Sequence, residues 1–182
     1  DGTPLPDPLQ ELHATTRMIH SYALAELCGL GGAEIVDHGM RYLAEGHADV
    51  GGWAWGVEGH TAIDRRKMAY GHVFVLLAAS SAQLVGHEDA PALLEAATGV
   101  LDRHFWEEEP GLIGADFDAH WQPLSSYRGM NANMHGSEGL MAAYEATGRE
   151  IYLERAGRIL DFFLRRQAPA HDWRIPEHYF ED

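Results

Sequence analysis

The sequence predicts an all-α protein built from helical hairpins, and three observations support this fold class. First, six segments carry apolar residues at a spacing of three to four, with Gly, Pro or Asp near their ends: residues 15–30, 33–46, 65–85, 90–105, 133–147 and 151–166. Second, Gly- and aromatic-rich segments follow every second helix, at residues 51–56, 111–121 and 173–180. Third, Trp55, Trp121 and Trp173 stand 66 and 52 residues apart, so a unit of two helices and one aromatic loop recurs about every sixty residues.

Helical hairpins of this kind can be arranged in two ways. A stack either continues as a solenoid or closes into an α/α barrel with its pocket at one end of the helices. The aromatic loops contain Trp, His and Asp, which are residue types that line pockets. The sequence therefore favours a closed barrel, of which these 182 residues supply about three hairpins.

Length, composition and charge limit the possible functions. The 182 residues are 46% hydrophobic, which is enough to bury a core as one domain. The net charge of −15 argues against nucleic acid and anionic membrane surfaces as partners, because both attract basic proteins. No apolar run is long enough to span a bilayer, and we expect a cytoplasmic protein without a signal peptide. Because the chain starts at Asp1 and stops at Asp182 within a new segment, we expect it to be cut at both ends.

The lone cysteine and the histidines do not indicate a thiol nucleophile or a metal site. Cys28 lies in the apolar run of residues 22–30, so we expect a buried, inert side chain in a reducing compartment. The twelve histidines include no HExxH motif or similarly spaced pair, so we expect no metal.

A polar stripe on an otherwise apolar helix is the most informative pattern in the chain. Asn131, His135 and Glu138 stand at i, i+4 and i+7 and therefore share one face. These side chains make directional hydrogen bonds, so we expect them to face a cavity, with a simply solvated face as the alternative. Gly136 and Gly139 are poor helix formers, which predicts a loose start to this helix.

Two further helices carry candidate site residues. Arg17 shares a face with His13 and His20, although an arginine in such a place often pairs with a carboxylate instead of a ligand. Tyr70 is expected to share a face with Lys67 and Phe74, and its alternative role is that of a core aromatic residue.

His178 is the candidate base. It is bracketed by Glu177 and Glu181, and a nearby carboxylate raises the basicity of an imidazole and fixes its tautomer. The alternative is an exposed loop histidine with incidental acidic neighbours.

Five strings together resemble the N-acylglucosamine 2-epimerase family, and in particular its mannose isomerase branch of aldose–ketose isomerases. They are RMIHSYALA, GGWAWGVE, KMAYGHVFVLLAAS, YRGMNANMHGSEGLMAAYEATG and RIPEHYFED. The resemblance implies an (α/α)6 barrel of about twice this length. Residues 1–182 are then the N-terminal part of one catalytic domain. It also implies a monosaccharide substrate and no cofactor, and it leaves a homo-oligomer open.

The resemblance assigns roles to individual residues. His178 matches the histidine that moves a proton between C1 and C2 of the sugar, and a second catalytic histidine lies outside this sequence. The substrate-binding residues are expected to be Arg17, Trp53, Tyr70, Asn131, His135, Glu138 and Glu181.

The expected activity is interconversion of D-mannose and D-fructose through an enediol, for which an imidazole is a suitable base at neutral pH. A carboxylate three residues after the histidine, Glu181, is more typical of the epimerase branch, so an N-acyl-D-glucosamine 2-epimerase or another sugar 2-epimerase is the first alternative. The second is a glycoside hydrolase that pairs Asp116 or Asp118 with Glu181. The third is a non-catalytic relative that binds a sugar or a protein.

Overall fold

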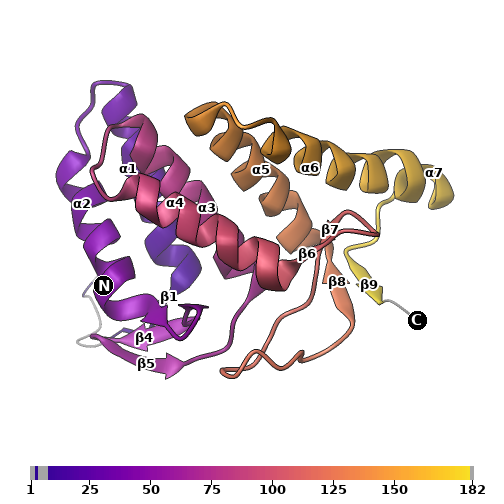
Figure 1. The fold of residues 1–182 in the computed structure, drawn as a ribbon, viewed down its shortest axis with the longest axis horizontal. Helices are drawn as coiled ribbons and strands as arrows, with labels where there is room; N and C mark the ends of the chain where they lie inside the picture. Colours follow the sequence, from indigo (N-terminus) through magenta and orange to yellow (C-terminus); the bar gives the residue numbers. More distant parts are fainter. Residues whose placement is uncertain (1–2, 4–7, 181–182) are drawn as a thin grey trace.

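The structure is a computed structural model that describes residues 3 and 8–180, and it consists of three helical hairpins (Figure 1). The first helices of the hairpins form one layer, in which α3 packs between α1 and α5. The second helices form another layer, with α2, α4 and α6 packed on α1, α3 and α5 respectively. Their bounds are α1 Leu12–Leu27, α2 Ala33–Tyr42, α3 Ala69–Leu84, α4 Ala90–Val100, α5 Met130–Thr147 and α6 Glu150–Asp161. The predicted all-α hairpin fold is therefore confirmed.

The core is centred on α3. Thirteen of its 16 residues are buried, which is the pattern of a helix that is covered on all sides. It touches α1 on one side, α5 on the other and α4 behind. Any polar side chain on this helix must therefore find a partner inside the protein or face a site.

Some helix ends match the prediction and others differ. The start of α2 at Ala33, the start of α4 at Ala90 and the end of α5 at Thr147 are as predicted, whereas α1 spans Leu12–Leu27 instead of residues 15–30. In α3 the helix begins at Ala69 instead of residue 65, because Lys67 is held extended by two backbone hydrogen bonds with Phe117. In α5 it begins at Met130, three residues earlier than expected. The outer helices continue as one wide π-helical turn each, at Leu43–His47, Leu101–Phe105 and Phe162–Gln167, and a short helix α7 (Ala168–Ala170) follows the last turn.

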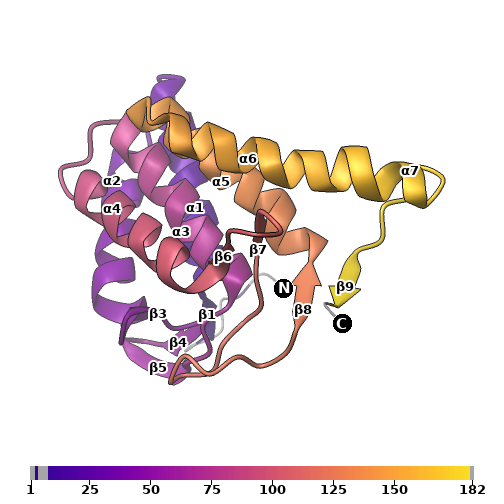
Figure 2. The same cartoon turned by 45° about the vertical axis from the view of Figure 1, so that its right-hand side comes forward.

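Short antiparallel strands precede or follow the helices of the inner layer. One sheet has the order β1–β4–β5, and three two-stranded ladders pair β2 with β3, β6 with β7 and β8 with β9. Figure 2 shows β8 and β9 beside the start of α5. The bounds are β1 Gln10–Glu11, β2 Ala48–Asp49, β3 Gly52–Trp53, β4 Gly56–Glu58, β5 Thr61–Asp64, β6 Trp106–Glu107, β7 Leu112–Ile113, β8 Tyr127–Gly129 and β9 His178–Phe180.

The start of α5 is tightly packed, so the predicted looseness is wrong. A Cβ atom on Gly139 would lie 2.9 Å from the carbonyl oxygen of Val73 in α3, and one on Gly136 would lie 2.1 Å from Cδ1 of Ile113. Glycine is needed at position 139, where the backbone of α3 leaves no room for a Cβ atom, whereas at position 136 the flexible end of the Ile113 side chain would have to move. The small residues lower the helix propensity but bring α5 against α3.

Cys28 is exposed, which corrects the prediction of a buried thiol. The helix α1 ends at Leu27, and Cys28 only caps it through a backbone hydrogen bond to the Leu24 carbonyl. Apolar neighbours such as Leu30, with 82% exposure, are uncovered as well, so the apolar run does not mark a core. Among the helices of residues 3 and 8–180, none has the length and hydropathy that a membrane-spanning helix needs.

Candidate active site

A row of contacting aromatic rings crosses the face of the inner layer that points away from α2, α4 and α6. His13 of α1 stacks on Trp55, with ring centroids 5.2 Å apart and planes inclined by 12°. Tyr70 of α3 lies between His13 and His135, at centroid distances of 5.7 and 5.5 Å. Phe74, one turn further along α3, contacts His135 at 4.7 Å. Three helices that are distant in sequence thus contribute to one aromatic wall.

Arg17 lies against this wall and supplies its positive charge. Its guanidinium carbon is 5.2 Å from the centroid of the Phe74 ring, a cation–π contact. Within the described part of the chain, no carboxylate lies within ion-pair distance of this guanidinium. The side chain is exposed. The described residues therefore give no support to an arginine neutralised by a carboxylate, and they provide no hydrogen-bond partner for the N–H donors of Arg17.

His135 and Glu138 form the charged pair of the predicted polar stripe. Nδ1 of His135 donates to Oε2 of Glu138 at 2.8 Å, because an ionised carboxylate can only accept. In a neutral ring, Nε2 is then left as an acceptor. The His135 side chain is 18% exposed and that of Glu138 is 46% exposed, so the pair lies at the edge of the wall.

His20 extends the same face of α1 by one more turn. Its Nδ1 lies 2.7 Å from Oγ of Ser81, and the Ser81 hydroxyl donates to the Leu77 carbonyl, so His20 is the donor. Burial lowers the pKa of His20, the negative charge of Glu138 opposes this, and the positive charge of Arg17 lowers it further. His20 is therefore neutral at pH 7. We call this whole group the inner-face cluster: His13, Arg17, His20, Trp55, Tyr70, Phe74, His135 and Glu138.

A cleft of about 130 Å³ adjoins the inner-face cluster at the start of α3 and α5. Tyr70 belongs to both the cleft and the cluster, and Asn131 lies one helical turn before His135. The complete lining is Ala69, Tyr70, Gly114, Ala115, Asp116, Tyr127, Gly129, Asn131 and Ala132. The predicted residues Tyr70, Asn131 and His135 are thus brought together: Tyr70 and Asn131 line the cleft, and His135 contacts Tyr70 in the aromatic wall.

His178 lies on strand β9, opposite Gly129 of β8. Its Nδ1 is 2.8 Å from the hydroxyl of Tyr127, which lines the cleft. The His178 side chain is exposed. Its catalytic role stays a prediction, and the predicted contact residue Glu181 lies outside the described residues.

Trp53 is placed away from the inner-face cluster. It is only 7% exposed, and its ring meets that of buried His72 at 5.7 Å. The chain leaves β3 at Trp53 and bends before β4, so it is Trp55 that reaches the aromatic wall. The structure therefore gives Trp53 a place in the core, and the two tryptophans of the GGWAWG segment have different surroundings.

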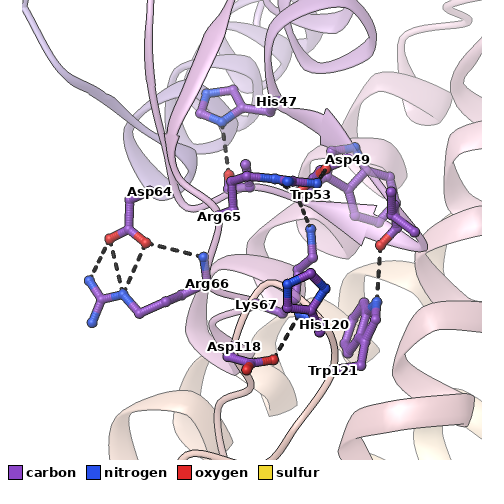
Figure 3. Close-up of polar contacts among 12 residues, drawn as sticks. His47, Asp49, Trp53, Asp64, Arg65, Arg66, Lys67, Asp118, His120 and Trp121 are labelled. Carbon is purple, nitrogen blue, oxygen red and sulfur yellow. Dashed lines mark hydrogen bonds and ion pairs between the residues drawn. The ribbon is translucent and has the colours of Figure 1, made fainter.

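Lys67 does not share a face with Tyr70 and Phe74. Its ammonium group is fully buried and donates to Asp49 at 2.6 Å, and Arg65 donates to the same carboxylate at 2.7 and 3.0 Å (Figure 3). Burial lowers the pKa of Lys67, and hydrogen bonds to Asp49 oppose that change. Burial alone would raise the pKa of Asp49, but hydrogen bonds from Arg65 and Lys67 bring it well below its usual range. Asp49, Arg65 and Lys67 thus form a structural network of ion pairs.

The side chains of the site can donate and accept hydrogen bonds. Among the described residues, no three His, Cys, Asp or Glu side chains stand close enough to hold a metal ion. From the sequence, Asp116 was expected only as a possible glycosidase carboxylate, and Tyr127 was not expected in the site. Asp116 lies in the loop after β7 and Tyr127 in β8, where no helical spacing links them to the other site residues. The readable signals for the inner face were the i, i+4, i+7 spacings of two sets of residues: His13, Arg17 and His20, and Asn131, His135 and Glu138.

Comparison with known proteins places the chain in one family. The model of the N-acylglucosamine 2-epimerase (GlcNAc 2-epimerase) family matches residues 1–182. D-mannose isomerase of Thermobifida fusca is 45% identical over 188 residues, which cover 100% of this chain and 46% of that protein. D-mannose isomerase of Pseudomonas cannabina pv. alisalensis is 37% identical over 169 residues, which cover 91% of this chain and 40% of that protein. The chain spans about half the length of the curated relatives that it matches.

Solved structures agree with this placement. A crystal structure of D-mannose isomerase matches with a TM-score of 0.90 at 34% identity, covering 97% of this chain and 48% of that chain. Cellobiose 2-epimerase from Spirochaeta thermophila DSM 6192 matches with a TM-score of 0.83 at 21% identity, which is a likeness of fold alone, over 95% of this chain and 49% of that chain. The predicted α/α barrel is thus confirmed as the fold, of which the chain covers about half. The chain belongs to the N-acylglucosamine 2-epimerase family.

Proposed function

We propose that the intact protein is a sugar isomerase that interconverts D-mannose and D-fructose, with residues 1–182 forming part of a single catalytic domain. The observation that carries this proposal is the inner-face cluster, where Arg17, Tyr70 and His135 offer polar groups beside a wall of rings. Such a wall packs on the apolar face of a sugar while the polar groups bind its hydroxyls. D-mannose isomerases that are 35% to 45% identical to this chain support the choice of substrate.

The reaction moves one proton between neighbouring carbons. A base removes the proton from C2 of the open-chain aldose, which leaves an enediolate. The proton is then added to C1, and the hydroxyl proton moves from O2 to O1. Arg17 is suited to stabilise the negative charge that develops on O1, because its donors are free and lie beside an apolar wall. The rings of Trp55, Tyr70 and Phe74 keep water away from the enediolate.

His178 is proposed as the base that carries this proton. The Tyr127 hydroxyl, 2.8 Å from Nδ1, holds one ring nitrogen and leaves Nε2 to act on the substrate. Tyr127 also lines the cleft that adjoins the cluster, which ties His178 to the same end of the inner helices.

Replacement of the base tests this role. His178→Asn should remove turnover of D-mannose while its Kd stays within about twofold of wild type. His171→Asn changes another exposed histidine, which also follows α7 in the chain. It is the matched control and should leave both quantities unchanged. Turnover that survives His178→Asn but is lost in His135→Asn contradicts the role of His178 and moves it to the inner-face cluster.

A glycoside hydrolase is the weaker candidate, because hydrolysis needs two carboxyl groups on either side of the scissile bond. Asp118 accepts the backbone N–H groups of His120 and Gln122 at 2.8 and 2.9 Å, so it builds a turn. Asp116 is the one carboxylate that the described residues bring to the cleft. Structures of glycosidases at 9% to 17% identity share the fold alone with this chain.

Proton NMR of D-mannose with the intact protein in D2O tests the proposed function. Fructose is the expected product, and deuterium at C1 marks the molecules in which the proton held by the base exchanged with solvent before its return. Glucose labelled at C2, or interconversion of N-acetylmannosamine and N-acetylglucosamine, would instead identify a 2-epimerase. A folded protein that yields no product and no exchange with any of these sugars contradicts the proposal.

A further inference from the structure

We propose that Asp116 is a substrate-binding residue that accepts hydrogen bonds from hydroxyl groups of the bound monosaccharide other than those on C1 and C2. The inference rests on the proposed function and adds to it a contact that determines specificity. Its basis is the cleft beside the inner-face cluster and the unused bonding capacity of one carboxylate within it.

The cleft has the size and the polarity of a subsite for part of a sugar. Its volume of about 130 Å³ far exceeds the roughly 10–15 Å³ that a single water needs. Polar side chains from four separate segments line it: Tyr70 from α3, Asp116 from the loop after β7, Tyr127 from β8 and Asn131 from α5. The remaining wall is mainly backbone and small residues, which leaves room for a ligand between the polar groups.

Asp116 is a half-buried carboxylate with little to bind inside the protein. Its Oδ1 accepts the Ala69 N–H at 2.6 Å, and this is its one hydrogen bond among the described residues. A carboxylate can accept about four. Burial raises the pKa of Asp116, while the Ala69 hydrogen bond and the charge of Arg66 oppose that change. The Arg66 guanidinium itself is bound to Asp64.

A role in helix capping does not account for the negative charge. The bond to Ala69 satisfies one free N–H at the start of α3, and an asparagine oxygen at the same place would satisfy it equally. A neutral amide would also lose less solvation on burial than a carboxylate does. A carboxylate is the stronger acceptor for hydroxyl donors, and a sugar presents several of these side by side.

The position of the cleft lets one sugar contact both Asp116 and the inner-face cluster. Tyr70 lies between the two and contacts His135 on the cluster side. Arg17 lies over Phe74, the next aromatic side chain of the wall. A sugar that contacts Arg17 and His135 therefore reaches past Tyr70 to Asp116, and because O1 and O2 take part in the reaction, the hydroxyls left for this carboxylate are those on the other carbons.

The test combines Asp116→Asn with deoxy sugars in the intact protein. The variant keeps the cap of α3, so the midpoint of urea unfolding should not change. The KM for D-mannose should rise about tenfold or more, the cost of weakening a charged hydrogen bond, and kcat should fall far less. With the one of 3-deoxy-, 4-deoxy- and 6-deoxy-mannose that lacks the bound hydroxyl, the variant and wild type should have the same KM. Asp118→Asn, in the same loop, is the matched control and should leave KM unchanged.

Two results would overturn the role of Asp116: an unchanged KM, or an equal rise in KM for mannose and for every deoxy sugar. Titration calorimetry with D-mannose separates this question from the proposed function. A wild-type protein that binds mannose without isomerising it contradicts only the isomerase, and the Kd values of wild type and Asp116→Asn then decide on Asp116. A wild type that binds none of these sugars contradicts both.

Discussion

Two groups of histidines, one beside the strands and one on the inner face, differ in how many of their ring nitrogens form hydrogen bonds. On the side of the strands, buried His72 binds the Met68 carbonyl through Nδ1 and the Trp53 N–H through Nε2. Buried His47 likewise uses both nitrogens, on Ala54 and Thr15. On the inner face, the hydrogen bonds of His135 and His20 within the described residues involve Nδ1 only.

The difference separates residues that stabilise the fold from residues that are available to a ligand. A buried polar group that is fully bonded costs little and specifies one conformation. A polar group with a free nitrogen beside a wall of rings has bonding capacity that only water or a ligand can use. For this reason the candidate site is the inner-face cluster. The charged group of Asp49, Arg65 and Lys67, whose members bind one another, is not.

Removing Asp49 should produce the largest effect on stability. Asp49→Ala leaves the fully buried ammonium of Lys67 without its carboxylate, and such a loss typically costs about 3–5 kcal/mol. Urea unfolding measures the change. Asp161→Ala breaks an exposed pair with Arg165 and should cost less than about 1 kcal/mol. Equal losses of unfolding free energy in the two variants would show that the buried pair stabilises the fold no more than the exposed pair does.

Removing Arg17 should affect catalysis and leave stability nearly unchanged. The side chain is exposed and lies over the Phe74 ring, so Arg17→Ala should change the free energy of unfolding by less than about 0.5 kcal/mol. Loss of a charged donor to the sugar should lower kcat/KM by about 10-fold to 100-fold. Steady-state kinetics with D-mannose measure this. A variant with wild-type kinetics would assign Arg17 no part in the site.

His72 should make stability depend on pH. Burial lowers the pKa of His72 to about 3, so in the folded protein it stays neutral at pH values where the unfolded chain, with a pKa of about 6.5, is protonated. The contribution of His72 to the free energy of unfolding is therefore fully present above about pH 6.5. It decreases as the pH falls toward 3, by up to about 1.4 kcal/mol per pH unit for this one proton.

Imidazole NMR identifies the residue responsible. The ring signals of His72 should not titrate down to about pH 4.5, because protonation of Nε2 would break the bond from the Trp53 N–H. A titration midpoint near 6.5 for His72 would contradict its placement among the buried histidines whose two ring nitrogens are both hydrogen-bonded.

The helices could be predicted from the sequence because their periodicity is local. The start of α3 could not, because a distant residue helps to set it: Asp116 binds the first N–H of α3 from 47 positions away. The looseness expected from Gly136 and Gly139 did not materialise either, since helix propensity is outweighed by the contacts that glycine permits with Ile113 and Val73.

The candidate site was predictable where its residues share a helix. Asn131, His135 and Glu138 could be grouped by spacing alone, whereas Trp53 and Trp55 could be told apart only by the bend between β3 and β4. The cleft joins Asp116 of a loop to Tyr127 of β8, and no periodic pattern connects them, so Asp116 could be suggested only as a possible glycosidase carboxylate and Tyr127 could not be predicted.

The most direct test of the inner face as the sugar site is a two-dimensional ¹⁵N–¹H spectrum of the imidazole rings of the intact protein, recorded while D-mannose is added. We predict that the signals of His135 and His20 shift with a common saturation curve and that those of His47 and His72 stay fixed. Saturable shifts of His47 or His72 with no change at His135 would place the sugar on the other side of α3 and contradict the assignment of the site.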